Sequence, residues 1–156
     1  MAASERLGFP ALWVPSMLAG AAAVNDVVAA TEVISGALVN STNSAFLTDL
    51  LIYTLDDIAP DLDIYLLESD VALGTEDSAP SVTDANAQEI IALIQTGTAY
   101  VDLGGVRILH LTEKDFGRIA LKSVEADGDI YGAVVTQTAV TFSAAGLVIR
   151  FKFLYF

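Results

Sequence analysis

The chain has 156 residues, the length of one ordinary domain that buries about 68–70% of its unfolded surface in a single core. Its 20 Asp and Glu residues outnumber its 7 Lys and Arg residues, and the formal net charge of −13 repels phosphate backbones and anionic membrane surfaces. Nucleic acid and membrane are therefore not expected as partners. The absence of Cys excludes disulfides and thiolate chemistry.

The N-terminal segment, residues 1–23, is apolar but broken before it reaches the length of a membrane span. Pro10 and Pro15 interrupt any helix here and favour an extended course. We predict either an arm that contacts another protein or an extra strand of the domain that follows; cleavage of the segment as a signal peptide is the alternative left open. Trp and Phe are frequent interface anchors, and exposed apolar segments mark interaction sites. The contact residues predicted for an arm are Leu7, Phe9, Leu12, Trp13 and Val14.

From residue 24 onward the pattern is that of short strands separated by turns. Residues 26–34 (DVVAATEVI) are rich in β-branched side chains. Residues 46–55 (FLTDLLIYTL) are apolar on both faces, which predicts a strand covered on both sides. Residues 61–68 (DLDIYLLE) alternate between apolar and polar positions, as a half-buried antiparallel strand does.

Two hairpins are predicted in the second half of the chain. Residues 100–111 form the first, with Gly104-Gly105 at its turn, because both central positions of a type I′ turn need a positive φ. In the second, residues 118–125 pair with residues 129–138 around Asp127-Gly128.

The chain ends on residues 147–156 (LVIRFKFLYF), whose alternation predicts a core strand, and a short strand at residues 140–143 precedes it. About eight strands at this spacing predict an all-β fold. We expect residues 24–156 to form a single-domain antiparallel β-sandwich of the jelly-roll or Greek-key type, with one short helix near residues 83–95.

The start of that helix overlaps an acidic stretch, residues 68–89, which raises the question of a metal or acid/base site. Residues 81–84 (SVTD) fit the spacing of a capping box, and apolar residues follow at helical spacing. Acidic side chains in a first helical turn suit the positive end of the helix. Much of the acidic stretch is therefore interpreted as structural.

A calcium loop of the EF-hand type needs Gly at its sixth position and Glu at its twelfth. Counted from Asp77, these positions hold Val82 and Gln88, so the pattern fails. No metal site is predicted. Adventitious calcium binding by Glu76, Asp77 and Asp84 is the alternative left open.

Catalytic motifs are missing from the sequence. His110 is the single histidine, and its strand setting is typical of a packed or surface residue. The G-x-S-x-G motif and the glycine-rich phosphate loops do not occur. A pair of carboxylates suited to glycoside hydrolysis is available in any acidic protein and carries no specific signal. We predict no enzyme, no catalytic residues and no cofactor.

The charge is unevenly distributed along the chain. Residues 1–106 hold 15 acidic residues and one basic residue, whereas residues 107–156 hold 5 acidic and 6 basic residues. Such an asymmetry favours head-to-tail contacts between copies or a partner with a basic face, and a solubilising surface is the plain alternative.

Three segments of the chain form a recognisable set: NDVV (25–28), LDIYLLESDVALGTEDSAPSVTDANAQE (62–89) and IYGAVVTQTAVTFSAAGLVIRF (130–151). In this order and spacing they resemble a family of small virion structural proteins of tailed bacteriophages, of which capsid decoration, or cement, proteins are the best understood. The resemblance extends from residue 24 to the end of the chain. Its motifs are structural and assign no catalytic residue.

The resemblance implies a non-enzymatic cement protein on the outer surface of a phage capsid. The implied partners are the major capsid protein and further copies of the chain, as a homotrimer, and the N-terminal arm would reach either of them. The alternative is a head-fibre or tail-associated β-sandwich that binds a host surface or a carbohydrate.

Overall fold

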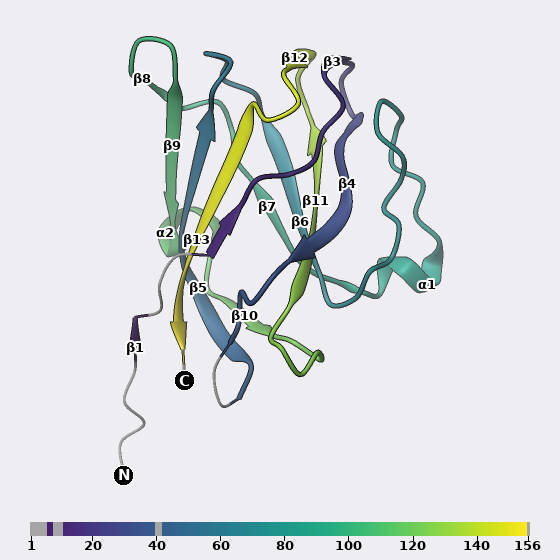
Figure 1. Ribbon diagram of the computed structural model, residues 1–156, viewed down its shortest axis with the longest axis vertical. Helices are drawn as coiled ribbons and strands as arrows, with labels where there is room; N and C mark the ends of the chain where they lie inside the picture. Colours follow the sequence, from purple (N-terminus) through teal and green to yellow (C-terminus); the bar gives the residue numbers. More distant parts are fainter. Residues whose placement is uncertain (1–5, 8–10, 40–41, 156) are drawn as a thin grey trace.

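Two antiparallel sheets pack face to face in the computed structural model, which describes residues 6–7 (backbone only), 11–39 and 42–155 (Figure 1). The seven-stranded sheet contains β1 (Arg6–Leu7), β2 (Ala11–Trp13), β5 (Ser44–Thr54), β8 (Val101–Asp102), β9 (Arg107–Thr112), β10 (Ile119–Lys122) and β13 (Leu147–Tyr155). The four-stranded sheet contains β4 (Val27–Ile34), β6 (Leu62–Leu67), β7 (Ile90–Gln95) and β11 (Ile130–Thr136). The remaining elements are the strand pair β3 (Gly20–Ala22) and β12 (Val140–Phe142) and the helices α1 (Asp84–Ala87) and α2 (Glu113–Phe116).

Eight of the strands pair in the order of one long hairpin, in which the first strand pairs with the last. β2 pairs with β13, β4 with β11, β5 with β9 and β6 with β7, so the first strand of the roll meets the last and pairing proceeds inward. The resulting orders are β2-β13-β5-β9 in one sheet and β4-β11-β6-β7 in the other. This is the eight-stranded jelly-roll arrangement. The predicted all-β sandwich is confirmed, and β2 is one of its defining strands.

The core lies between the two sheets and is built by alternate residues of their strands. In β13, the side chains of Ile149, Phe151 and Phe153 are fully buried, and the two Phe rings stack with centroids 6.0 Å apart. Burying one such Phe side chain stabilises the fold by about 1.5–3 kcal/mol. The predicted C-terminal core strand is thereby confirmed.

A second, smaller apolar cluster lies on the outer side of the four-stranded sheet. Val27, Leu67 and Leu73 belong to it, and the acidic stretch between β6 and β7 covers it (Figure 1). The backbone of this stretch is held to β4, since Val27 N donates to Ser78 O at 2.9 Å and Asp77 N donates to Val27 O at 3.0 Å. The acidic stretch therefore serves as a cover for one sheet.

The prediction of a helix near residues 83–95 was only partly right. The helix α1 has a single turn, capped by Thr83, whose hydroxyl accepts a hydrogen bond from Asn86 N at 3.2 Å. Residues 90–95 form the strand β7 and pair with β6, because the β-branched run there gains more from the ladder than from a helical turn. A complete capping box occurs elsewhere, between Thr112 and Asp115 in α2, which the sequence analysis missed.

The predicted hairpin of residues 118–125 with residues 129–138 was wrong. β10 pairs with β5 and β11 pairs with β4 and β6, so the connection crosses from one sheet to the other. Gly128 has φ of 77° and lies so close to Leu38 that an added Cβ would meet the Leu38 backbone at 2.8 Å. Asp127-Gly128 does form a turn, but this turn lies in the connection between β10 and β11. It packs against the loop that follows β4. The first predicted hairpin is confirmed by the pairing of β8 with β9.

Candidate interaction surface

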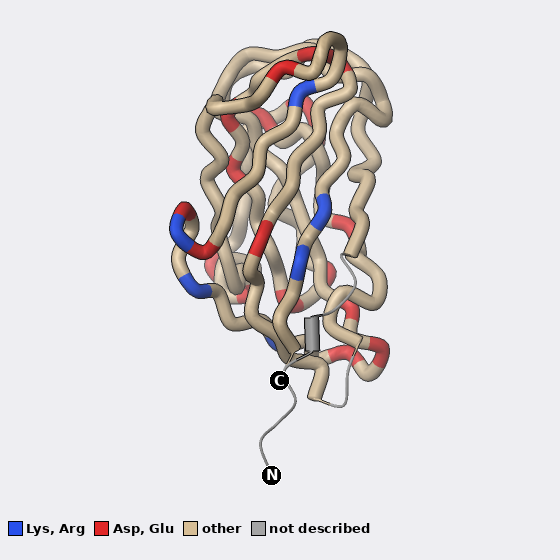
Figure 2. Tube along the Cα trace, turned by 90° about the vertical axis from the view of Figure 1, so that its left-hand side faces the viewer, with Lys and Arg blue, Asp and Glu red and all other residues tan. Residues whose placement is uncertain are grey.

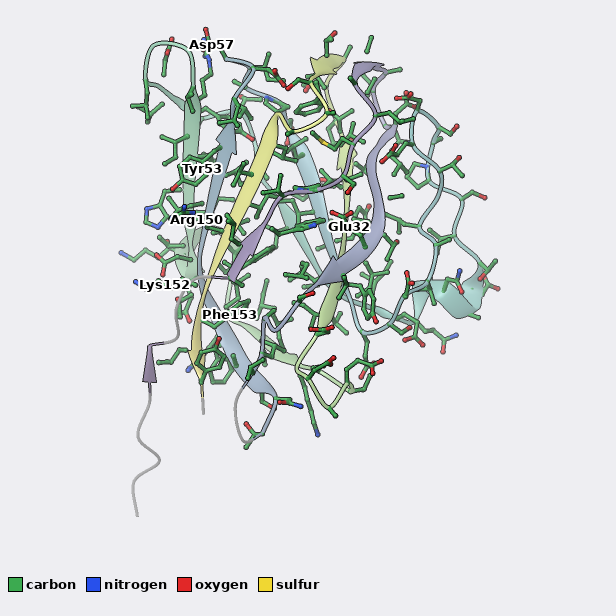
Figure 3. The ribbon with its side chains drawn as sticks, in the orientation of Figure 1. Glu32, Tyr53, Asp57, Arg150, Lys152 and Phe153 are labelled. Carbon is green, nitrogen blue, oxygen red and sulfur yellow. The ribbon has the colours of Figure 1, made fainter. Side chains whose placement is uncertain are left out.

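The N-terminal segment contributes a strand to the sandwich, which favours the second of the two roles predicted for it. Trp13 is only 4% exposed, and its ring stacks on Phe151 with centroids 6.3 Å apart. Its Nε1 donates to Glu32 Oε1 at 2.6 Å, and Glu32 also accepts from Ser16 N at 2.9 Å. Glu32 lies on β4, as Figure 3 shows, so this contact ties the segment to the opposite sheet. Trp13 is therefore a core residue of its own chain and offers no surface to a partner.

The other predicted contact residues occupy different positions. Leu12 and Val14, on either side of Trp13, are 56% and 46% exposed. Leu7 lies in β1, opposite Leu154 at the edge of the sheet. Phe9 lies outside the described residues. For these four residues, contact with a partner stays a prediction.

The outer side of the seven-stranded sheet is a mixed apolar and charged surface. Strand β5 was predicted to be covered on both sides, but only its inner side is buried. A β-bulge opposite Lys152 and Phe153 turns both Thr48 and Asp49 away from the core. We call this surface the outer face; it consists of Phe46, Asp49, Leu51, Tyr53, Ile108, His110, Arg118, Val148, Arg150, Lys152 and Leu154.

Neighbouring strands bring these residues into cross-strand rows. The rows are Val148, Tyr53 and Ile108, then Arg150, Leu51 and His110, then Lys152, Asp49 and Thr112. Side chains opposite one another on an antiparallel pair lie close enough to interact. The apolar members of the outer face belong to neither described core cluster and are only partly buried.

Two guanidinium groups stack on aromatic rings of this surface. The Arg118 guanidinium lies 4.1 Å from the centre of the Phe46 ring, and that of Arg150 lies 5.7 Å from the centre of the Tyr53 ring. Figure 3 shows Tyr53, Arg150 and Lys152 on the outer side of the sheet. Each such contact contributes about 0.5–1 kcal/mol at an exposed site. It also restricts the flexible Arg side chain to positions over the aromatic ring.

Asp49 lies at the centre of this face. Its Oδ1 is 2.8 Å from His110 Nε2, and its Oδ2 is 3.8 Å from Lys152 Nζ. Partial burial by itself would raise the pKa of Asp49, but hydrogen bonds from His110 and Thr48 and the positive charge of Lys152 outweigh it. The net result is a pKa below the ordinary value, so the carboxylate is charged at neutral pH.

Acidic and basic residues are distributed unequally between the two sheets. All seven basic residues lie on strands of the seven-stranded sheet or between β9 and β10: Arg6, Arg107, Lys114, Arg118, Lys122, Arg150 and Lys152. Figure 2 looks onto this sheet and shows basic residues along its strands and around α2. The four-stranded sheet and its connections carry 13 of the 20 acidic residues and no Lys or Arg: Asp26, Glu32, Asp61, Asp63, Glu68, Asp70, Glu76, Asp77, Asp84, Glu89, Glu125, Asp127 and Asp129. The remaining 7 acidic residues balance the 7 basic ones in number, so the four-stranded side is strongly acidic and the rest of the chain has no net charge.

Shallow depressions of the described surface lie beside the outer face and at the end of the sandwich near β3 and β12. One adjoins the outer face and is lined by Thr48, Thr112, Glu113, Lys114, Arg118 and Leu154. The other lies near β3 and β12, where Arg107 donates to Asp57 at 2.9 Å. Because the charged lining residues of the second depression are paired with each other, the first is better suited to receive a charged group from a partner.

Two side chains of the acidic stretch have structural partners, and the stretch forms no metal-binding group among the described residues. Among the described residues, no three His, Asp or Glu side chains gather as a group suited to hold a metal ion. Glu76 accepts a hydrogen bond from Leu18 N, and Glu89 accepts one from the Ser69 hydroxyl, so both have structural partners. None of the helices in the described part of the chain has both the length and the apolar character that membrane crossing requires.

Compared with known proteins, the chain matches no protein-family model and no curated sequence.

Sequence reasoning missed the outer face, although one signal for it was present. Asp49 interrupts an otherwise apolar strand, and Arg150 and Lys152 alternate with buried residues in β13. Charged residues at alternate positions of adjacent strands mark a surface-facing side. The pairing of β5 with β13, which joins positions 93 to 110 residues apart in the chain, was not visible in the sequence.

Proposed function

We propose that this protein is a non-enzymatic virion structural protein, a capsid decoration or cement protein on the outer surface of a tailed-phage head. The observation that carries the proposal is the outer face: a partly apolar, cation-bearing surface on a jelly roll whose core is complete without it. Surfaces of this composition are typical of protein–protein contacts, in which aromatic residues and Arg are enriched.

Two further observations support the proposal. Jelly rolls are common in viral capsid proteins, although they also occur in lectins and other proteins, so the fold alone assigns no function. The sequence segments of residues 25–28, 62–89 and 130–151 resemble virion proteins of tailed phages. In this proposal the partners are the major capsid protein and further copies of the chain, as a homotrimer. The shell is contacted by the edge of the sheet that carries Leu7, Leu12 and Val14.

The test is the copy number of the protein in purified virions, measured by quantitative mass spectrometry against the major capsid protein. A decoration protein is expected in hundreds of copies per particle. Copies in the tens or fewer would overturn the proposal in favour of a fibre or tail component. A protein absent from virions would exclude both.

A host-binding or carbohydrate-binding module of the head fibre or tail is the second candidate. It is favoured by one observation: the partly exposed Tyr53 ring lies in the row next to Leu51 and His110, near the hydrogen-bonding groups of Asp49. An aromatic ring beside polar groups suits the stacking and hydrogen bonding that bind sugars. Binding to a glycan array that is lost in Tyr53→Ala would support this candidate.

A further inference from the structure

The outer face has a complementary surface on the same molecule. Glu125, Asp127 and Asp129 lie in the segment that leads into β11, just before Tyr131, and Asp70 follows β6, whose Leu67 pairs with Tyr131. We call this surface the acidic end. Partial burial and the negative charges of these four carboxylates raise the pKa of Tyr131.

The acidic end also presents apolar side chains. Val33 lies opposite Tyr131 in the β4–β11 pair and is 43% exposed. Val39 and Val124 are each 62% exposed, and the loop that carries Val124 is held beside Val39 because Leu38 N donates to Gly128 O at 2.9 Å. The acidic end thus combines apolar groups with negative charge, as the outer face combines them with positive charge.

We propose that the outer face binds the acidic end of a second copy of this chain, with Arg118, Arg150 and Lys152 opposite the carboxylates. The apolar groups of the two surfaces cover each other in this contact, and Tyr53 and Phe46 are its aromatic anchors. Such a contact is heterologous, because the two copies use different surfaces. The proposal deepens the proposed function, because it assigns a surface to the contacts between copies. It rests on the proposed association of the chain with further copies of itself.

A symmetric contact of two outer faces is disfavoured by charge. It would bring together two surfaces that each carry Arg118, Arg150 and Lys152, and like charges across an interface oppose binding. Asp49 is the single acidic residue of the outer face and offsets only one of its three cationic charges, which leaves the face net positive. The arrangement that pairs opposite charges is the heterologous one.

Ionic strength is expected to act on this contact in a specific way. Two copies of net charge −13 repel each other at long range, and about 0.15 M salt screens that repulsion beyond ~8 Å. Ion pairs at the contact persist under those conditions and weaken at about 1 M salt, where the screening length is ~3 Å. Association is therefore expected at moderate salt and should be lost at high salt.

The experiment uses the full chain and two charge-reversal variants in sedimentation velocity, up to about 100 μM because small interfaces bind weakly. The variant Arg150→Glu/Lys152→Glu makes the outer face acidic, and Glu125→Lys/Asp127→Lys makes the acidic end basic. Each variant alone should weaken self-association by about tenfold or more. An equimolar mixture should restore it, because the acidic outer face of one variant then meets the basic end of the other. Asp84→Lys, exposed on α1 and outside both surfaces, is the control that should behave like the wild type.

Three results would overturn the proposal: a monomeric wild-type chain at every concentration and salt, unchanged association in the acidic-end variant, or no recovery in the mixture of folded variants. Circular dichroism and the thermal midpoint confirm folding. If Lys152→Glu destabilises the fold by lying beside Asp49, Arg118→Glu replaces it as the outer-face variant. A protein that is monomeric in solution but present in hundreds of copies per virion would contradict this inference. It would not contradict the proposed function.

Discussion

Replacing Trp13 tests whether the N-terminal segment is a strand of the fold or an arm. Trp13→Ala removes a ring that is 4% exposed and stacked on Phe151, and truncations of this kind cost about 3–5 kcal/mol. A domain has only about 5–15 kcal/mol of stability, so the loss is a large share. For a chain of this length, the thermal midpoint should fall by about 6–20 °C. Urea denaturation followed by circular dichroism measures the free energy of unfolding directly.

Two further variants separate the contributions to this effect. Trp13→Phe keeps most of the ring but removes the N–H group that donates to Glu32, and a hydrogen bond to a charged group contributes about 1.5–3 kcal/mol. Because Ser16 N still binds Glu32, the cost should lie at the lower end of that range. Leu12→Ala, at an exposed neighbouring position, should change stability by less than about 0.5 kcal/mol. A cost of Trp13→Ala below about 1 kcal/mol would show that the segment is not part of the folded domain.

Three other predictions concern the packing at Gly132, the N-terminal segment and Asp49. Gly132→Ala should destabilise the fold by about 1–3 kcal/mol, measured by urea denaturation, because an added Cβ would lie 2.7 Å from the Trp13 ring; a neutral effect would contradict the packing described. Deleting residues 1–10 should leave the β-type circular dichroism spectrum unchanged, whereas deleting residues 1–15 removes β2 and should prevent folding; equal behaviour of the two truncations would refute this. The lowered pKa of Asp49 stabilises the fold above the unfolded value of 3.8, and this contribution is lost as pH falls through the folded value. His110→Ala should therefore make the acid-induced loss of stability below about pH 4 smaller, and an unchanged pH profile would argue against the Asp49–His110 contact.

Local patterns were sufficient to predict the fold class and most strands. Alternation in residues 147–156 identified β13, and Gly104-Gly105 identified the hairpin of β8 and β9, because both signals depend on a few neighbouring residues. The charge asymmetry was also visible, since it is a count along the chain. For the same reason the sequence alone showed that the EF-hand pattern fails at Val82 and Gln88.

Tertiary contacts decided the features that local patterns misrepresented. Residues 90–95 have apolar side chains compatible with a helix or a strand, and pairing with β6 made them a strand because a backbone ladder was available there. Trp13 is apolar in either role, and only its position over Gly132 and beside Glu32 places it in the core. The outer face likewise exists only after β5, β9 and β13 are paired, because its charges and rings come from segments far apart in the chain. A sequence determines which residues are able to form a surface, and the register of the sheet determines which of them meet.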